Sequence, residues 1–205
     1  MIGNDIIDLK MADHEAWRRK RYLDKIFHPV EQELIGKSAY PSLCLWQLWS
    51  MKESAYKSHF RKKDRRRFNP IQLRCFLSGG ESDVFDSGVV RIEGCEYLTH
   101  SVITGDYIHT TARLCSKQRL QIQSGIVCSK EASDLRPQII EALKTTYSDG
   151  TNLRPENIIF EKDSDRIPYL RISGSLLSSL YAGKSSARPC SISHHGDYGA
   201  FAFLS

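Results

Sequence analysis

The pattern that most constrains the fold is one long helical segment followed by several short β-rich runs. From Pro41 to Phe60, apolar residues recur close to every 3.6 positions, which predicts one helix whose first turn suits Pro41. Glycine-containing turns then separate four runs that predict an antiparallel meander: Ile71 to Leu77, Gly88 to Ile92, Tyr97 to Ile103 and Tyr107 to Leu114. The first half should therefore consist of helices packed on an antiparallel sheet.

The remainder of the chain follows a similar order of elements. We expect a strand from Gln121 to about Val127, a helix from Ser129 to Tyr147 and a loop at 148–150. Further elements are predicted as strands around Ile158 to Glu161 and Tyr169 to Ile172, a short helix from Ser175 to Tyr181, and a hairpin from Ser191 to Leu204. These patterns indicate an α+β fold, although no sequence similarity between the halves is visible.

A carboxylate interrupts the apolar run at the start of the chain. The segment from Ile2 to Leu9 has the β-branched composition of a buried strand, and Asp5 lies between isoleucine and asparagine within it. A buried carboxylate is costly unless a cation or a metal compensates it, so Asp5 is a candidate ligand. The alternative is an edge strand whose Asp5 faces water. Asp8 would point to the opposite face, because strand side chains alternate.

A second acid and a base lie on the predicted helix. Glu53 and Lys57 are four positions apart, so their side chains are neighbours on one helical face. In an arbitrary helix, such a pair is a surface ion pair worth a few tenths of a kcal/mol. The surrounding sequence gives the pair a different context.

Three motifs stand out: Gly3-Asn4-Asp5 at the start of the chain, Trp49-Ser50-Met51-Lys52-Glu53-Ser54 with Lys57 on the predicted helix, and Cys190-Ser191-Ile192-Ser193-His194-His195-Gly196 at the far end. Together they resemble the Gly-x-Asp, helical Lys-Glu and Ile-Ser-His signatures of the 4′-phosphopantetheinyl transferase superfamily. Taken alone, Ser193 would be interpreted as a turn or capping residue.

The resemblance implies a fold of two similar halves, each with helices packed on an antiparallel sheet, in a pseudo-dimeric arrangement. The halves would be residues 1–117 and 118–205, in one compact unit with the site between them. In the larger, surfactin-type members the Ile-Ser-His element precedes the Asp strand, whereas here it lies at the far end. The halves therefore resemble a circular permutation of that arrangement, which is tolerated when chain termini lie close together.

The resemblance also implies an activity of the holo-acyl-carrier-protein synthase type. Such an enzyme moves phosphopantetheine from coenzyme A to a serine of an apo acyl or peptidyl carrier protein, with Mg²⁺ as cofactor and 3′,5′-ADP as leaving group. Asp5 and Glu53 would hold the metal, Glu53 would accept the serine proton, and Lys57 would meet a phosphate oxygen. Lys52 would support cofactor binding. Whether the carrier serves fatty-acid, polyketide or peptide synthesis stays open.

Other positions match the family less closely. Ser193 and His194 would contact the nucleotide part of coenzyme A, together with Arg136 and Arg166. In surfactin-type members a third acidic residue stands two places after the metal aspartate, and here that position is Ile7. This departure leaves a non-catalytic relative that binds coenzyme A or a carrier protein as an alternative.

Clustered basic residues indicate an acidic partner. The formal net charge is +5, and Arg18, Arg19 and Arg21 lie in one run on the predicted first helix, where the resemblance implies docking of an acidic carrier protein. A second basic cluster at 61–67, flanked by Phe60 and Phe68, favours a nucleic-acid-binding module as another alternative. Either run can also be an ordinary solvated face.

Targeting signals are not apparent in the sequence. No apolar run approaches the roughly 18 residues of a membrane span, and the N-terminal residues do not form a signal-peptide pattern. We therefore expect a cytoplasmic protein. Because two halves can build one cleft internally, we also expect a monomer.

Overall fold

The structure is a computed structural model that describes residues 1–60, 68–78, 86–116, 121–129, 132–151, 158–163, 167–172 and 187–204. Three features of the sequence analysis lie outside the described residues, namely the basic cluster at 61–67, Arg166 and the expected helix at 175–181.

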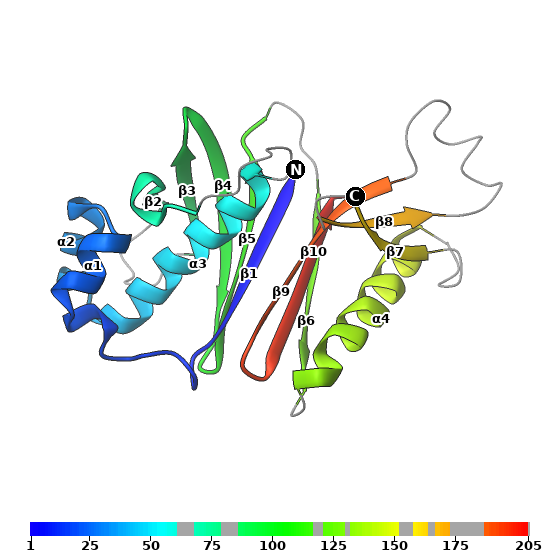
Figure 1. The fold of residues 1–205 in the computed structure, drawn as a ribbon, viewed down its shortest axis with the longest axis horizontal. Coiled ribbons are helices and arrows are strands. Elements are labelled where there is room, and N and C mark those ends of the chain that lie inside the picture. The colour runs from blue at the N-terminus through cyan, green and yellow to red at the C-terminus, as the bar shows by residue number, and fades with distance from the viewer. Residues whose placement is uncertain are drawn as a thin grey trace.

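The first half is one antiparallel sheet covered by helices (Figure 1). Its elements are β1 (Ile2–Asp8), η1 (Ala16–Arg18), α1 (Lys20–Ile26), α2 (Pro29–Lys37), α3 (Pro41–His59), η3 (Pro70–Gln72), β2 (Arg74–Ser78), β3 (Ser87–Ile92), β4 (Cys95–Ile103) and β5 (Tyr107–Leu114). The strands lie in the order β1-β5-β4-β3-β2, and apolar side chains of α3 pack against them, with Leu45, Leu48 and Met51 fully buried.

The second half repeats this topology. Its strands lie in the order β6-β10-β9-β8-β7, so that in each half the first strand pairs with the last and the others follow in reverse. The elements are β6 (Ile122–Cys128), α4 (Ala132–Thr151), β7 (Ile158–Lys162), β8 (Pro168–Ile172), β9 (Ala187–His195) and β10 (Tyr198–Leu204). The shared order confirms the prediction of an α+β fold with two similar halves.

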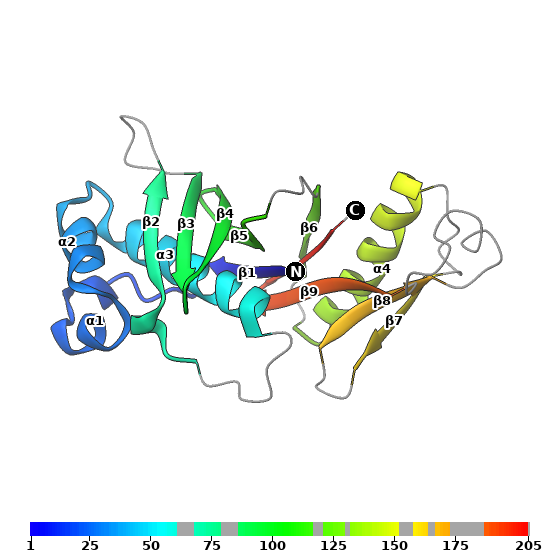
Figure 2. The same ribbon diagram turned by 90° about the horizontal axis from the view of Figure 1, so that it is seen from above.

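The two sheets meet along β1, β9 and β10, and β1 lies beside β9 in both ribbon views (Figures 1 and 2). On β1, Gly3 faces α3 while the side chain of Asn4 faces β9. On β10, Gly199 faces Ile139 of α4. The helices therefore lie on the sides of the sheets that face away from the contact between the halves.

Two local predictions were wrong. The expected loop at 148–150 continues the helix, since α4 extends to Thr151 and the Ser148 hydroxyl donates a hydrogen bond to the carbonyl of Lys144, one turn earlier. The basic run is not on one helix: η1 ends at Arg18, Arg19 is extended, and α1 begins at Lys20.

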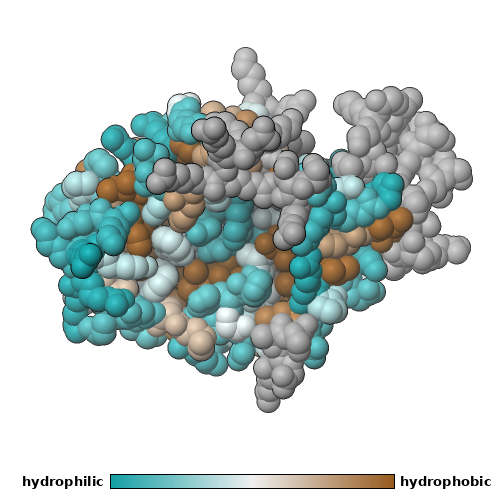
Figure 3. All heavy atoms as spheres, viewed as in Figure 1, coloured by the Kyte–Doolittle hydropathy of each residue, from teal (hydrophilic) through white to brown (hydrophobic). Residues whose placement is uncertain are grey.

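The outer surface of the first half is polar where it carries the short helices. In the space-filling view, hydrophilic side chains gather over α1 and α2 (Figure 3). None of the helices in the described part of the chain is long and apolar enough to cross a membrane.

Candidate active site

Helix α3 lies directly on the N-terminal strand because Gly3 has no side chain. A Cβ atom at Gly3 would come within 2.0 Å of the Ser54 carbonyl oxygen and 2.7 Å of the Ser58 nitrogen. The Ser54 hydroxyl donates to the carbonyl of Thr110 on β5, 2.9 Å away, and ties the helix to the neighbouring strand. This close approach brings the last turns of α3 beside Asp5.

Lys57 bridges the helix and the strand. Its Nζ lies 2.9 Å from Oδ1 of Asp5 and 3.1 Å from the carbonyl oxygen of Asn4. The Asp5 side chain is 11% exposed and that of Lys57 is 30% exposed. An ammonium group has three N–H donors, so within the described residues one donor of Lys57 is left for a further acceptor. The ion pair of Lys57 is thus with Asp5, on another element.

Glu53 completes a cluster of two acids and one base. Burial raises the pKa of Glu53 above its ordinary value, while the charge of Lys57 lowers that pKa and the charge of Asp5 raises it further. Both charged groups that shift this pKa, Asp5 on β1 and Lys57 on α3, belong to the ion pair described above. That Asp5 and Glu53 form a metal-binding pair stays a prediction.

The cluster has a feature that fits a divalent cation. Oδ2 of Asp5 is buried and has no hydrogen-bond partner among the residues that the structure describes. A buried carboxylate oxygen without a partner is costly, and carboxylate oxygens are the ligands that Mg²⁺ takes in proteins. Asp5 and Glu53 are thus suitable ligands for the ion.

A third protein carboxylate is not supplied by β1. Ile7 is 4% exposed and packs with Ala12 and Ile108 in a small apolar cluster. In the ranges described, no three histidine, cysteine or acidic side chains gather in a way that could hold a metal. An ion held by Asp5 and Glu53 would need further oxygen ligands, and water or substrate could supply them.

The two residues of the Ser-His pair lie on opposite faces of β9. Ser193 is 6% exposed, and its hydroxyl accepts a hydrogen bond from Nδ2 of Asn4, 3.0 Å away, in the contact between the halves. His194 is exposed and lines a pocket on the α4 side. This geometry argues against the expected contact of Ser193 with coenzyme A and leaves His194 as a candidate.

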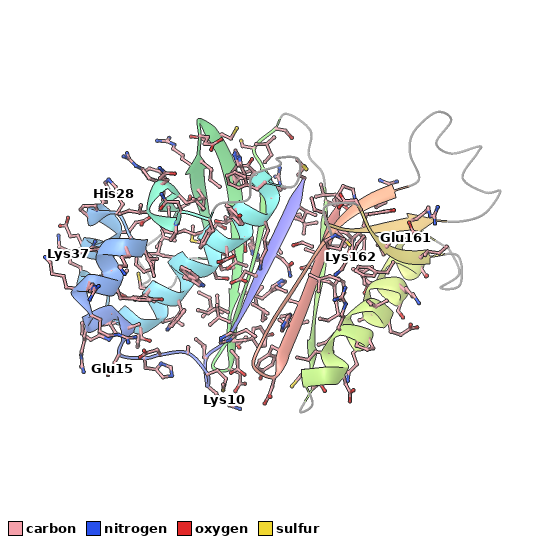
Figure 4. The ribbon with its side chains drawn as sticks, in the orientation of Figure 1. Lys10, Glu15, His28, Lys37, Glu161 and Lys162 are labelled. Carbon is pink, nitrogen blue, oxygen red and sulfur yellow. The ribbon has the colours of Figure 1, made fainter. Side chains whose placement is uncertain are left out.

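The pocket in the second half has a volume of about 340 Å³. Basic side chains from three elements line it, with apolar neighbours between them: Leu135, Arg136, Ile139, Phe160, Lys162, Pro168, Ile192 and His194. The Arg136 guanidinium lies 5.9 Å from the centre of the Phe160 ring. Figure 4 shows Lys162 on β7, close to α4. The sequence analysis missed Lys162 and Phe160, whose alternation on β7 was the available signal.

Lys52 has a structural environment that differs from the expectation. Its side chain is fully buried, and Nζ lies 2.7 Å from Oε2 of Glu31. The same ammonium donates to the carbonyl oxygens of Pro70 and Leu73, so all three of its N–H groups have partners. A side chain held in this way cannot reach a ligand at the surface without leaving the core. The expectation that Lys52 binds the cofactor is therefore corrected.

The basic run near α1 is exposed. Arg18 pairs with Glu15, and Arg19 pairs with Asp13. Arg21 is exposed at the start of α1. The side chains are accessible to a partner, although two of them already have acidic neighbours.

The comparison with protein families decides the classification. The model of the 4′-phosphopantetheinyl transferase superfamily matches residues 1–112, more than half of the 205 residues. The chain belongs to the 4′-phosphopantetheinyl transferase superfamily. No curated protein and no solved structure matches it. The match covers the half that carries Asp5, Glu53 and Lys57, and the family is one of transferases.

Proposed function

We propose that this transferase moves the 4′-phosphopantetheine group of coenzyme A to a serine hydroxyl of an apo acyl or peptidyl carrier protein. The observation that carries the proposal is the cluster on β1 and α3. The cluster contains a buried oxygen of Asp5 that has no hydrogen-bond partner among the described residues, and the ammonium of Lys57. It also contains the carboxyl group of Glu53, and burial raises the pKa of this group. This combination suits a reaction in which charge on a pyrophosphate must be neutralised.

Asp5 and Glu53 would hold Mg²⁺, which when bound neutralises negative charge on the phosphate oxygens. Lys57 would use its remaining N–H donor for a phosphate oxygen, while Asp5 and the Asn4 carbonyl fix its position. A cation held in advance stabilises the developing charge without reorganisation during the reaction.

Glu53 is the proposed general base. Burial raises its pKa above the ordinary value, so its carboxylate accepts a proton more readily than an exposed carboxylate does. The serine hydroxyl loses its proton to Glu53 and its oxygen forms a bond to the β-phosphorus of coenzyme A. The bond from that phosphorus to the bridging oxygen breaks, and 3′,5′-ADP leaves with the electron pair.

The pocket of the second half is the proposed nucleotide site. Arg136, Lys162 and His194 supply positive or hydrogen-bonding groups around a partly apolar hollow with Phe160 in its wall. Such a lining suits an aromatic base next to phosphate groups. Arg136, Lys162 and His194 are the proposed contacts with coenzyme A.

An acidic carrier protein is the proposed second substrate. Arg18, Arg19 and Arg21 are exposed on the same part of the first half, where complementary charge would mainly speed the encounter. Because Arg18 and Arg19 already have acidic neighbours, Arg21 should contribute most to this attraction.

Thermal unfolding tests the proposal against a nucleic-acid-binding role. Coenzyme A with Mg²⁺ should raise the midpoint of unfolding, and a single-stranded oligonucleotide at equal phosphate concentration should not. The reverse result would favour the nucleic-acid-binding alternative.

The variant Glu53→Gln separates catalysis from binding alone. If wild type modifies an apo carrier protein and the variant loses most of that activity but still binds coenzyme A, the non-catalytic alternative fails. Equal activity of both proteins would remove Glu53 from the mechanism.

A further inference from the structure

Asn4 connects the catalytic cluster with the second half of the protein. It lies on β1 one residue before Asp5 and is fully buried. On the side of the second half, its backbone N–H donates to the Ser191 hydroxyl at 3.0 Å, and its Nδ2 donates to the Ser193 hydroxyl at 3.0 Å. Two serines of β9 thus hold one residue of β1.

The same residue also contacts the catalytic lysine. The carbonyl oxygen of Asn4 accepts a hydrogen bond from Nζ of Lys57 at 3.1 Å, and Oδ1 of the adjacent Asp5 accepts one from the same ammonium at 2.9 Å. Asn4 therefore has β9 on one side and Lys57 on the other. A displacement of β1 at this position would move both acceptors of the ammonium together.

A third group limits the orientation of the Asn4 amide. Nδ2 lies 3.4 Å from Nε2 of His109, which is on β5. An amide nitrogen has two N–H donors, so it can serve Ser193 and His109 at once when Nε2 of the imidazole is an acceptor. Burial lowers the pKa of His109 to about 4, which keeps the ring neutral at physiological pH. The amide is thus held from two strands.

We infer that Asn4 is a positioning residue that holds β1 against β9 through its hydrogen bonds. The arrangement of Lys57 and Asp5 therefore depends on the contact between β1 and the second half. The inference rests on the proposed function, and it goes beyond that function because it assigns a catalytic effect to a contact between the halves. It also gives the Ser193 hydroxyl a role that requires no contact with substrate.

The structure offers a matched control at the other end of the same contact. Oδ2 of Asp8 accepts from the backbone N–H of Asp197 at 3.0 Å, and the Asp8 N–H donates to Nδ1 of His195 at 2.9 Å. These bonds join the same two parts of the protein but involve neither Lys57 nor Asp5. Loss of the Asp8 side chain should weaken the contact without changing the catalytic cluster.

Steady-state kinetics and urea unfolding of five proteins test the inference: wild type, Asn4→Ala, Ser193→Ala, the double variant, and Asp8→Ala. We expect kcat to fall about tenfold in each of the Asn4 and Ser193 single variants, with the KM for coenzyme A changed less than twofold. The double variant should be no slower than either single variant, because both remove one interaction. Asp8→Ala should lose stability with kcat within twofold of wild type.

The outcomes separate the inference from the proposed function. A wild-type protein that modifies no carrier protein refutes the proposed function and the inference with it. If wild type is active and Ser193→Ala keeps a kcat within twofold of it, the inference alone is overturned. It is also overturned if Asp8→Ala loses both stability and kcat, because the loss of activity would then follow from the weaker contact between the halves in general. Ser193→Ala removes one oxygen atom, so the test remains decisive even if Asn4→Ala does not fold.

Discussion

Nζ of Lys57 on α3 lies 2.9 Å from Oδ1 of Asp5 on β1, although the two residues are 52 positions apart in the chain. The pair joins a strand and a helix at the point where Gly3 allows them to touch. It also leaves Oδ2 of Asp5 without a described partner and places a positive charge beside Glu53. This relationship gives the site its two acids and one base.

Replacement of the lysine should slow the reaction strongly. Lys57→Met keeps much of the side-chain volume but removes the charge that would meet a phosphate oxygen, so we expect kcat to fall by roughly 10²- to 10³-fold. The acidic limb of the pH profile should also move to higher pH, because the charge of Lys57 lowers the pKa of Glu53. Initial rates across a pH series measure both effects.

Lys37→Met is the control for this variant. Lys37 is exposed on α2 and pairs with Glu33 one turn away, on the surface, where an ion pair contributes little to stability. Its activity should equal that of wild type. A similar loss of rate in both variants would show that general loss of positive charge, rather than Lys57, is responsible.

Glu53→Gln should be more stable than wild type at neutral pH and nearly inactive. Since the folded pKa of Glu53 is raised above the ordinary 4.5, mainly by burial, the folded state binds the proton more tightly than the unfolded state. Its contribution to stability is fully present below pH 4.5 and is lost as pH rises through the folded pKa. The amide of the Glu53→Gln variant has no charge to bury, so the variant does not lose stability in this way as the pH rises.

Urea unfolding at several pH values checks this prediction. The free energy of unfolding of wild type should fall, relative to that of Glu53→Gln, as pH rises above 4.5. A variant that is less stable than wild type at neutral pH would contradict the raised pKa of Glu53.

Gly3→Ala should separate the helix from the strand. The added Cβ would lie 2.0 Å from the backbone oxygen of Ser54, which cannot move without α3, so we expect a loss of about 1–3 kcal/mol together with reduced activity. Chemical denaturation and initial rates are the measurements.

Gly36→Ala provides the comparison for the glycine variant. A Cβ at Gly36 in α2 meets nothing within 4 Å, and alanine favours a helix over glycine by about 0.5–1 kcal/mol. This variant should be as stable as wild type or more so, with unchanged activity. Equal stability of the Gly3 variant and wild type would refute the close approach of α3 and β1.

Lys52→Met should destabilise the fold without direct loss of cofactor binding. Removal of the ammonium leaves Glu31 buried at 3% exposure without its cation, and breaking a buried pair in this way costs about 3–5 kcal/mol. Changing Glu31 to leucine in addition should restore part of the loss. Unfolding curves of the single and double variants measure it.

Coenzyme A titration of Lys52→Met under conditions where it is folded provides the second readout. The dissociation constant should match that of wild type. A large weakening in the folded protein would restore Lys52 as a cofactor contact.

The fold was predictable to the extent that local patterns determine it. The 3.6-residue period predicted α3 within one residue of its end, and the β-rich runs predicted the strands of the meander. The prediction of a loop at 148–150 was wrong because the hydroxyl of Ser148, a residue typical of turns, donates a hydrogen bond to the preceding turn of the helix. The order of elements predicted two similar halves, but no sequence similarity between the halves supported it, since two sheets can share strand order without sharing side chains.

The motifs marked the residues of the cluster but not all of its contacts. Lys57 pairs with Asp5, whereas the metal and phosphate roles that the resemblance implies for Asp5, Glu53 and Lys57 stay predictions. For Lys52 and Ser193, the motif did not reveal the partners, Glu31 and Asn4, because these contacts are made across separate elements. Helical and strand periods give the face on which a side chain lies, but the group opposite that face depends on tertiary packing.

Intact-mass analysis of apo carrier proteins tests the central claim most directly. A panel of fatty-acid, polyketide and peptide-synthetase carriers would be incubated with coenzyme A, Mg²⁺ and either wild type or Asp5→Asn. We predict that wild type adds one phosphopantetheine group to at least one carrier and that Asp5→Asn adds at least about 10²-fold less in the same time. No modification of any carrier by folded wild type, or equal modification by a folded Asp5→Asn variant, would contradict the proposed role of Asp5 and the cluster around it.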